Sequence, residues 1–516
     1  MGVFRRTSAH PDTLRPEVAN GHPNDPEKAR RRNKNKEPEL PRYNEQGQQI
    51  NHAGHVVTRG VAPDGESGRF WFHPWHFLRI CFRSSSTASM WTNLLWPFTI
   101  ASLVLHFGYG DHDLWIFITA YLGMVPCANL VGFAGQELAR KMPKVAGVIM
   151  ETTFGSVVEI ILFVVLIAND GGNLGVIRAA ILGSILANVL FCLGKDIARM
   201  ICVGVFSANS MLGMCFFVGG IFHPQQTFHE AISEVGSNLM LVAAVGLVIP
   251  TIYYNSLAGG RLTAQQADAE ALKISRGAAV VLLVAFFVYI WFQSRSHHGL
   301  YEDILEADEE RDHDRHKDLT KDKLTFTESI IAVVVALTFV SFAAVFLVQQ
   351  IHFMVEERHI SDAFLGLILI PLVEKVSEHL TAIDEAYDNQ MNFALSHVLG
   401  SSIQTALLNT PIVVIVGWGL GRDMSLTFEL FDAVVLILAI IVVGNFLRDE
   451  KSDYLEGALC VFVYILVAVS AWYYPDPREE GGVSSAGSPE GGEGTATASE
   501  AVAHAATTAA RMMFKV

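Results

Sequence analysis

Twelve apolar segments between residues 91 and 474 constrain the fold of this chain more than any other feature. They lie at 91–107, 114–133, 145–168, 176–194, 214–222, 231–254, 277–293, 328–350, 363–383, 393–418, 431–447 and 455–474. Most are long enough for a helix to cross the hydrocarbon core of a bilayer, which takes roughly 20 residues. If 176–194 and 214–222 form one interrupted helix, the sequence predicts an all-α polytopic membrane protein with about 11 transmembrane helices.

The composition of the chain agrees with a membrane protein. Hydrophobic residues make up 51% of the sequence and charged residues 17%, and the charges gather in a few segments. The net charge of −15 argues against nucleic-acid binding, and the six cysteines lack the CxxC spacing of a metal site. The sequence has no phosphate loop and no aspartyl-phosphate motif, so we expect neither an enzyme nor an ATP-driven pump, and no cofactor.

The polar segments divide the chain into five parts. Residues 1–85 are polar and rich in Arg and Lys, which predicts a disordered cytosolic arm, and 475–516 have the composition of a disordered tail. An acidic, His-containing linker at 294–327 is expected in the cytosol, and its lack of EF-hand spacing favours a mixed-charge helix over a calcium sensor. The linker separates a first transmembrane half at 86–293 from a second at 328–474.

Basic residues in the short loops indicate how the helices are oriented, because cytosolic loops carry an excess of Lys and Arg. The residues concerned are Arg79, Arg83, Arg140, Lys141, Lys144, Arg295, Arg448 and Lys451. Their loops all fall on one side if the helices alternate from a cytosolic N-terminus. One leading helix would then precede two five-helix repeats of opposite orientation, as in many secondary transporters.

Two acidic residues lie inside apolar segments, where a charge costs roughly 2.5–3.5 kcal/mol on insertion scales and therefore usually marks an ion or proton path. They are Glu159 and Glu378, and each is followed by a segment with a Gly-Ser motif, at Gly183–Ile185 and Gly400–Ser402. The repeat motifs as a whole cover 151–194 and 371–418. Two matching contexts predict a duplicated transporter whose binding site lies between the halves.

The motifs resemble those of the cation/proton exchangers in the calcium/cation antiporter superfamily, which share the sodium/calcium exchanger membrane region. The residues that carry this resemblance are Gly155–Glu159, Gly183–Asn188, Glu374–His379 and Gly400–Gln404. The resemblance implies that Glu159 and Glu378 bind the transported cation and the proton. It also implies a polar lining for the transport site, made of Ser184, Asn188, Ser401, Ser402 and Gln404. Ser156, which stands where the family has Asn, and Ser377 are further candidate site residues.

The second motif departs from the family pattern, because Glu374 and Lys375 stand where the family has Gly-Asn. Glu374 lies four residues before Glu378 and Lys375 three residues before it, so both can reach that carboxylate on one helix. A fixed ammonium there would weaken the field that Ca²⁺ needs, since this ion takes six to eight oxygen ligands. Glu374, Lys375 and His379 are therefore candidate selectivity residues. This version of the motif is most similar to a fungal vacuolar branch that includes a low-affinity monovalent cation/proton antiporter.

The resemblance and the chemistry predict the same mechanism. Protons and a metal ion compete for the same carboxylate oxygens, and competition at one site produces exchange. We expect the protein to exchange cytosolic Ca²⁺ for lumenal protons, with Na⁺ or K⁺ as the alternative cation and a cation channel as a less favoured function. The vacuolar membrane is the expected location, with the endoplasmic reticulum or another endomembrane as alternatives. The expected partners are inorganic cations, protons and the lipid bilayer.

An insert interrupts the first motif. Residues 195–213 separate Phe191–Gly194 from Met214–Gly220, and their removal would restore one continuous helix. The codons possible at Gly194–Lys195, and at the far end of the insert, can encode splice signals. We therefore consider a retained intron, with a genuine insertion that forms an extra cytosolic loop as the alternative.

Overall fold

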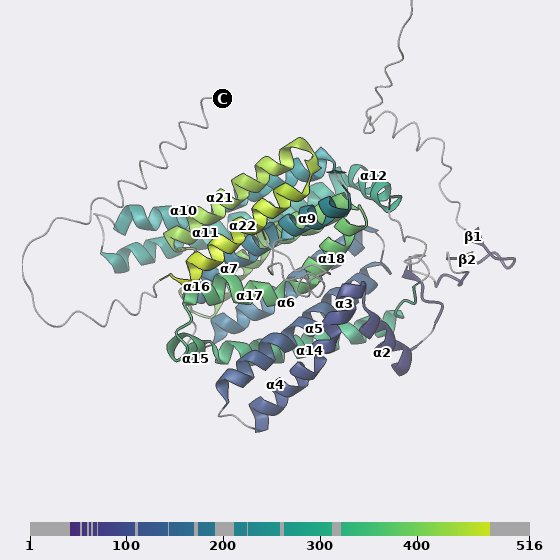
Figure 1. The fold of residues 1–516 in the computed structure, drawn as a ribbon, viewed down its shortest axis with the longest axis horizontal. Coiled ribbons are helices and arrows are strands. Elements are labelled where there is room, and N and C mark those ends of the chain that lie inside the picture. Colours follow the sequence, from purple (N-terminus) through teal and green to yellow (C-terminus); the bar gives the residue numbers. More distant parts are fainter. Residues whose placement is uncertain are drawn as a thin grey trace, which may run out of the picture.

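The computed structural model describes residues 42–51, 54–58, 61–62, 65–69, 71–108, 112–142, 144–169, 174–190, 211–223, 225–258, 263–311 and 321–474. Figure 1 shows a bundle of helices lying side by side, with the N-terminal helices along one edge and the last two helices on the opposite side. The strands in the described part are short: β1 (Arg42–Tyr43) pairs with β2 (Gln49–Ile50), and β3 (Gln226–Thr227) with β4 (Lys451–Ser452), both antiparallel.

The helices of the described chain follow the predicted apolar segments. Before and within the linker they are α2 (Pro74–Arg83), α3 (Thr87–Thr92), η2 (Asn93–Leu95), α4 (Trp96–Gly108), α5 (Asp113–Ala139), α6 (Lys144–Ala168), α7 (Leu174–Leu190), α9 (Met211–Phe222), α10 (Glu230–Ala258), α11 (Ala264–Trp291), η3 (Phe292–Ser296) and α12 (His298–Glu309). After it they are α14 (Phe326–Gln349), α15 (Ile351–Glu356), α16 (Asp362–Phe364), η4 (Leu365–Leu369), α17 (Ile370–Glu374), α18 (Val376–Tyr387), α19 (Met391–Gln404), η5 (Thr405–Asn409), α20 (Thr410–Gly419), α21 (Leu430–Phe446), η6 (Leu447–Asp449) and α22 (Tyr454–Trp472).

Among the described residues, 7 helices are long and apolar enough to cross a membrane. They are Asp113–Ala139, Glu230–Leu257, Gln265–Ser296, Phe326–Glu356, Met391–Gly419, Leu430–Asp449 and Tyr454–Trp472. Two shorter apolar helices, Thr153–Ala168 and Leu174–Leu190, accompany them. Outward-facing side chains on several of these helices are apolar, for example Leu438 and Leu466, which are 55% and 66% exposed. The prediction of an α-helical membrane protein is confirmed.

Small residues bring the two halves of the chain together at one crossing. A Cβ atom added at Gly183 of α7 would collide with the backbone carbonyl of Leu367 in η4, and one added at Gly366 would lie 2.6 Å from Ala179 Cβ. Glycine at both positions therefore permits close contact of the two backbones, as at many helix crossings in membranes. This crossing sets the first Gly-Ser motif against the helix that leads to Glu374.

Two π-helical segments, η4 and η5, interrupt the helices of the second motif. Each is followed by a proline, Pro371 or Pro411, which cannot donate a backbone hydrogen bond. The helix also breaks at Lys375, with φ −94° and ψ 0°, so the predicted segment 363–383 is not one continuous helix. Such interruptions are frequent at functional sites. They separate Glu374 in α17 from Glu378 in α18.

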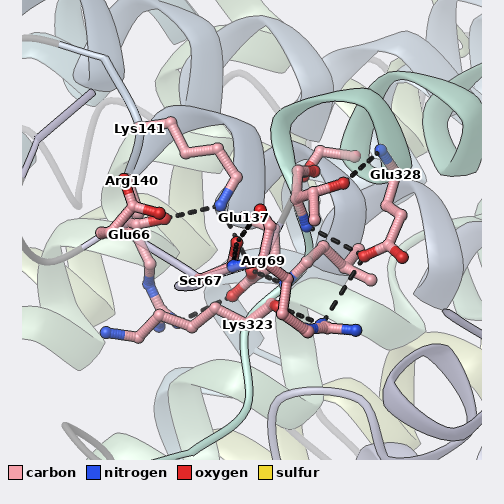
Figure 2. A network of polar contacts seen from close by, with 12 residues as sticks. Glu66, Ser67, Arg69, Glu137, Arg140, Lys141, Lys323 and Glu328 are labelled. Carbon is pink, nitrogen blue, oxygen red and sulfur yellow. Dashed lines mark hydrogen bonds and ion pairs between the residues drawn. The ribbon is translucent and has the colours of Figure 1, made fainter. Parts of the chain in front are cut away.

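Residues 65–69 and 71–73, here named the N-terminal strap, lie beside the end of α5 and the start of α14; Figure 2 shows Glu66, Ser67 and Arg69 of this strap close to Glu137, Lys141 and Glu328. Lys141 Nζ donates a hydrogen bond of 2.7 Å to the carbonyl oxygen of Gly65. Arg69 Nη2 lies 3.6 Å from Glu328 Oε2, in a salt bridge whose carboxylate is fully buried. The strap therefore joins the beginning of the chain to both transmembrane halves.

The described part of 1–85 is thus folded, which departs from the disorder that its composition indicates. The physical reason lies in partners far along the chain. Arg69 Nη2 donates a hydrogen bond of 2.7 Å to the carbonyl oxygen of Lys323, and Glu328 Oε1 accepts one of 3.0 Å from the backbone N–H of His73. Local composition does not reveal such contacts. Residues 1–41 lie outside the described chain, as do 475–516 and the part 195–210 of the insert, where the intron hypothesis applies.

The linker helix α12 is fixed to the start of α19 by Asp308. This carboxylate is fully buried and accepts hydrogen bonds from the backbone N–H and the side-chain amide of Asn392, at 2.7 and 2.9 Å. Burial raises the pKa of Asp308 above its ordinary value, against the opposing effect of the bonds from Asn392 and the charge of Arg311. The acidic side chain therefore acts as the N-terminal cap of a helix that leads into the transport motif.

We expect Asp308→Ala to destabilise this contact by about 1–3 kcal/mol, because it leaves the buried donors of Asn392 unsatisfied. Asp308→Asn retains one acceptor oxygen without a charge, and since the folded state favours the neutral form of this side chain, it is expected to cost less. Thermal unfolding of the detergent-solubilised protein measures both changes. Equal melting temperatures for the wild type and Asp308→Ala would contradict the capping role.

Candidate cation-binding site

Helix α6 places Glu159 in the interior of the bundle, where the residue is 1% exposed. Its Oε2 atom accepts hydrogen bonds from Thr405 Oγ1 at 2.9 Å and from Asn409 Nδ2 at 2.7 Å. The same oxygen lies 2.7 Å from the Nζ atom of Lys375. All three donors come from the second half of the chain, so Glu159 connects the two halves.

Lys375 also reaches the second candidate carboxylate. Its Nζ atom lies 3.5 Å from Glu378 Oε2 and donates a hydrogen bond of 3.3 Å to Ser401 Oγ, while the Ser401 hydroxyl donates to Glu378 Oε2. Lys375 is 2% exposed, and the break between α17 and α18 places it at the start of the helix that carries Glu378. One ammonium therefore lies between the two predicted transport carboxylates.

The first Gly-Ser motif completes this cluster from α7. Ser184 donates a hydrogen bond to Glu374 Oε1, and Asn188 Nδ2 donates one of 3.0 Å to Ser401 Oγ. Ser184 and Asn188 are four residues apart and share a helix face. Both are fully buried, and Glu374 is 3% exposed. Residues from both predicted motifs thus belong to one hydrogen-bonded network.

The remaining predicted site residues have different surroundings. Ser156 Oγ donates a hydrogen bond of 2.7 Å to Gln404 Oε1, which joins α6 to α19. Ser402 instead donates to the carbonyl oxygen of Val398 in its own helix, at 2.9 Å. His379 is fully buried in α18, and the side chain of Ser377 lies outside the described part. Their roles stay predictions.

Thr405 and Asn409 were missed by the sequence analysis. They follow Ser401 by four and eight residues, so all three share one face of the helix. This spacing of polar residues in an apolar segment was the signal that could have identified them. Both residues belong to η5, and their side chains donate the hydrogen bonds that Glu159 accepts from the second half of the chain.

Several acceptor oxygens in this cluster are buried without a hydrogen-bond partner. They are Glu159 Oε1, Glu374 Oε2, Asn188 Oδ1 and Asn409 Oδ1. Buried polar atoms normally have partners, and these oxygens accept only from hydrogen-bond donors or cations. Carboxylate and amide oxygens are also the ligands preferred by hard cations such as Ca²⁺. The chemistry of this donor set therefore fits a cation-binding site.

The cluster contains three acidic side chains and one basic side chain, and their formal charges can be summed. With all groups ionised, Glu159, Glu374, Glu378 and Lys375 carry two net negative charges, which is the charge of Glu159 and Glu378 alone. In that state Glu374 and Lys375 together add no net charge to the cluster, and the expected effect of Lys375 on cation choice stays a prediction. In the described residues, no group of three or more His, Cys, Asp and Glu is placed to hold a metal ion. The ammonium of Lys375, not a third acid, lies between the carboxylates.

The fold and the buried charge cluster define a class, membrane transporters for ions, and comparisons with known proteins identify the family. A sequence profile of the sodium/calcium exchanger protein family matches residues 112–198 and 328–473. Vacuolar cation/proton exchanger 2 of Oryza sativa subsp. japonica is 30% identical over 389 residues, which cover 75% of this chain and 82% of that protein. The chain belongs to the sodium/calcium exchanger family, among its cation/proton exchangers. The resemblance seen in the motifs is confirmed.

The chain is also similar to other transporters and to a solved structure. The vacuolar calcium ion transporter of Schizosaccharomyces pombe is 30% identical over 361 residues, covering 70% of this chain and 79% of that protein. The Ca²⁺/H⁺ antiporter of Aphanothece halophytica is 29% identical and is covered over 95% of its length, with 74% of this chain. Among solved structures, native YfkE has a TM-score of 0.57 at 22% identity, covering 74% of this chain and 100% of that one. This last likeness indicates a shared fold.

Proposed function

We propose that the protein is a secondary antiporter that exchanges cytosolic Ca²⁺ for lumenal protons across a vacuolar-type membrane, using Glu159 and Glu378. The observation that carries this proposal is the cluster in which two carboxylates, the buried Glu159 from the first half and the partly exposed Glu378 from the second, contact the same ammonium. The names of the relatives support calcium and protons as substrates and the vacuole as the location.

The exchange follows from competition for oxygen atoms. A cation that enters the site takes the place of the Lys375 ammonium and binds the carboxylate oxygens together with unpartnered oxygens such as Glu159 Oε1. On the acidic side, protons bind the carboxylates and release the cation. Because either a cation or protons satisfy the same acids, the transport of one is coupled to the opposing transport of the other.

The proposed topology has eleven membrane helices, with one leading helix followed by two inverted five-helix repeats. The leading helix and the first repeat lie within 86–293 and the second repeat within 328–474, joined by the linker 294–327 and followed by the tail 475–516. Hydrogen bonds that join loops and the neighbouring parts of helices support this arrangement, because they fall into two separate groups.

One group joins loops that the proposed topology places in the cytosol. Its hydrogen bonds run from Gln226 to Ala386, from Phe228 to Glu450 and from Asn392 to Asp308, at 2.8, 3.1 and 2.7 Å. The other group joins loops expected in the lumen, with bonds from Arg178 to Ser425, from Phe428 to Thr251 and from Ser361 to Ala471, at 3.1, 2.9 and 2.7 Å. None of these bonds crosses between the groups, as alternating helices require.

A monovalent cation/proton antiporter is the second candidate function, and the position of Lys375 favours it. A monovalent ion carries the charge of the ammonium that it would replace between Glu159 and Glu378. A divalent ion would bring one further positive charge to the same place, with Glu374 as a nearby acid able to balance it. Which cation the protein transports therefore depends on the combined charge of Glu159, Glu374, Glu378 and Lys375.

Flux measurements on the purified protein in vesicles with an acidic interior test the proposal. We expect added Ca²⁺ to collapse the pH gradient, because each entering ion must release protons from the site. Collapse by Na⁺ or K⁺ alone would support the monovalent alternative. Cation uptake that proceeds equally without a proton gradient would indicate a channel and contradict both forms of antiport.

A further inference from the structure

Helix α2 turns an apolar and basic face away from the rest of the protein. Its inward stripe contains Phe77, Ile80 and Cys81, of which Ile80 is 5% exposed. On the opposite side the exposed residues are Trp75, Leu78, Arg79, Phe82 and Arg83, with Trp75 81% exposed and Leu78 59% exposed. Residues at these spacings form one stripe along a helix. An apolar stripe facing outward on a short helix requires a partner other than water.

Both ends of α2 are hydrogen-bonded to residues at or near the start of other helices. The side-chain amide of Asn93, directly before α4, donates hydrogen bonds to the carbonyl oxygens of Phe82 and Cys81, at 2.9 and 3.2 Å. At the other end, the backbone N–H of His73 donates to Glu328 Oε1 at 3.0 Å, in the first turn of α14. Figure 1 shows α2 at the edge of the bundle beside α3. The helix is therefore held at the level where two proposed membrane helices start.

The outward face of α2 continues toward surfaces that face lipid. Trp91 and Leu94, between α2 and α4, are 66% and 62% exposed, and Ile100 and Val104 of α4 are 59% and 56% exposed. Since α4 is the proposed first membrane helix, its exposed apolar side chains contact acyl chains. Exposed apolar residues are thus present on α2, on the segment directly before α4 and on α4 itself.

We propose that α2 lies in the cytosolic headgroup layer of the membrane and binds anionic lipids. In this position Trp75, Leu78 and Phe82 enter the boundary between headgroups and acyl chains, as the apolar face of an interfacial helix does. Arg79 and Arg83 lie beside them and pair with lipid phosphates, which attract basic residues at the cytosolic leaflet. The choice of leaflet rests on the proposed topology, whereas the contact with lipid does not rest on the proposed antiport.

Photo-crosslinking of the full chain in native membranes tests the occupant of this face. With benzoylphenylalanine in place of Phe82, we expect adducts whose added mass is that of a phospholipid. Tyr43, which is 60% exposed in the β1–β2 hairpin, offers a matched control position at which no lipid adduct is expected. Adducts at Phe82 with another protein, or with a second copy of this chain, would overturn the proposal.

The headgroup preference is tested separately. Arg79→Gln/Arg83→Gln is expected to lower the affinity of the purified protein for phosphatidylinositol or phosphatidylserine by about tenfold or more in native mass spectrometry. Lys273→Gln/Arg422→Gln removes the same charge from the first part of α11 and from the segment after α20, both expected on the opposite side, and serves as the control. Equal retention of anionic lipid by wild type and the arginine variant would overturn the role of the two arginines. Normal ion exchange by that variant would leave the proposed antiport intact.

Discussion

Glu159→Gln and Glu378→Gln are each expected to abolish cation/proton exchange, with a loss of at least about a hundredfold in initial rate. Glutamine keeps the shape and hydrogen-bonding capacity of the side chain, but it carries neither the charge that a cation needs nor an exchangeable proton. Both carboxylates contact the Nζ atom of Lys375, at 2.7 and 3.5 Å, so either change also leaves the ammonium with one carboxylate fewer. The measurement is gradient-driven uptake into vesicles that contain equal amounts of purified protein.

Two neighbouring serines provide a matched control for this experiment. Ser401 donates to Glu378 and accepts from Asn188, whereas the hydroxyl of Ser402 is bonded to the carbonyl oxygen of Val398 in its own helix. We therefore expect Ser401→Ala to impair exchange and Ser402→Ala to retain most of it. Normal exchange by either glutamine variant would remove the paired-carboxylate mechanism. Loss of exchange in Ser402→Ala would show that the site extends beyond the residues grouped here.

The transmembrane helices could be predicted because their signal is local. A helix in a bilayer must be apolar along its whole length, so the hydropathy of a segment is enough to locate α10 or α14. The break at Lys375 was not predictable in this way, since the hydropathy of a segment does not report where its helix is interrupted. The break depends on the backbone conformation of Lys375, four residues after Pro371. The strap was hidden for a related reason, because Arg69 is ordered by a salt bridge to Glu328 on a helix far along the chain.

The site shows the same division between local and distant information. Motif spacing identified Glu378 and its neighbour Lys375, which are three residues apart on adjoining helices. It gave no indication that Lys375 also reaches Glu159, because that contact depends on how α6 packs against the second half. The hydrogen bond that Asn409 donates to Glu159 was missed for the same reason. Motif spacing thus predicted several members of the cluster but not Thr405 or Asn409, and tertiary packing determines how the charges are paired.

Lys375→Asn is expected to raise the apparent affinity for Ca²⁺ relative to Na⁺ and K⁺ by about tenfold, since it removes a cation from between two carboxylates and adds an amide oxygen. The single change also leaves three acids without their ammonium, and unpaired buried charges are strongly destabilising. Glu374→Gln/Lys375→Asn keeps the net charge of the wild-type cluster while it removes the lysine. We expect this pair of changes to give the calcium preference with less loss of folded protein.

A charge-preserving variant separates the role of the ammonium from that of the side-chain volume. Lys375→Arg keeps the positive charge, so we expect the ion preference of this variant to stay close to that of the wild type. Competition of Ca²⁺ with Na⁺ and K⁺ for proton-driven uptake measures all three variants under one set of conditions. An unchanged profile in both asparagine variants would mean that Lys375 serves as a structural partner of the glutamates rather than as a selectivity residue. A shift only in the charge-balanced variant would instead show that Glu374 and Lys375 control cation choice as a pair, because neither acts on the field of the site independently of the other.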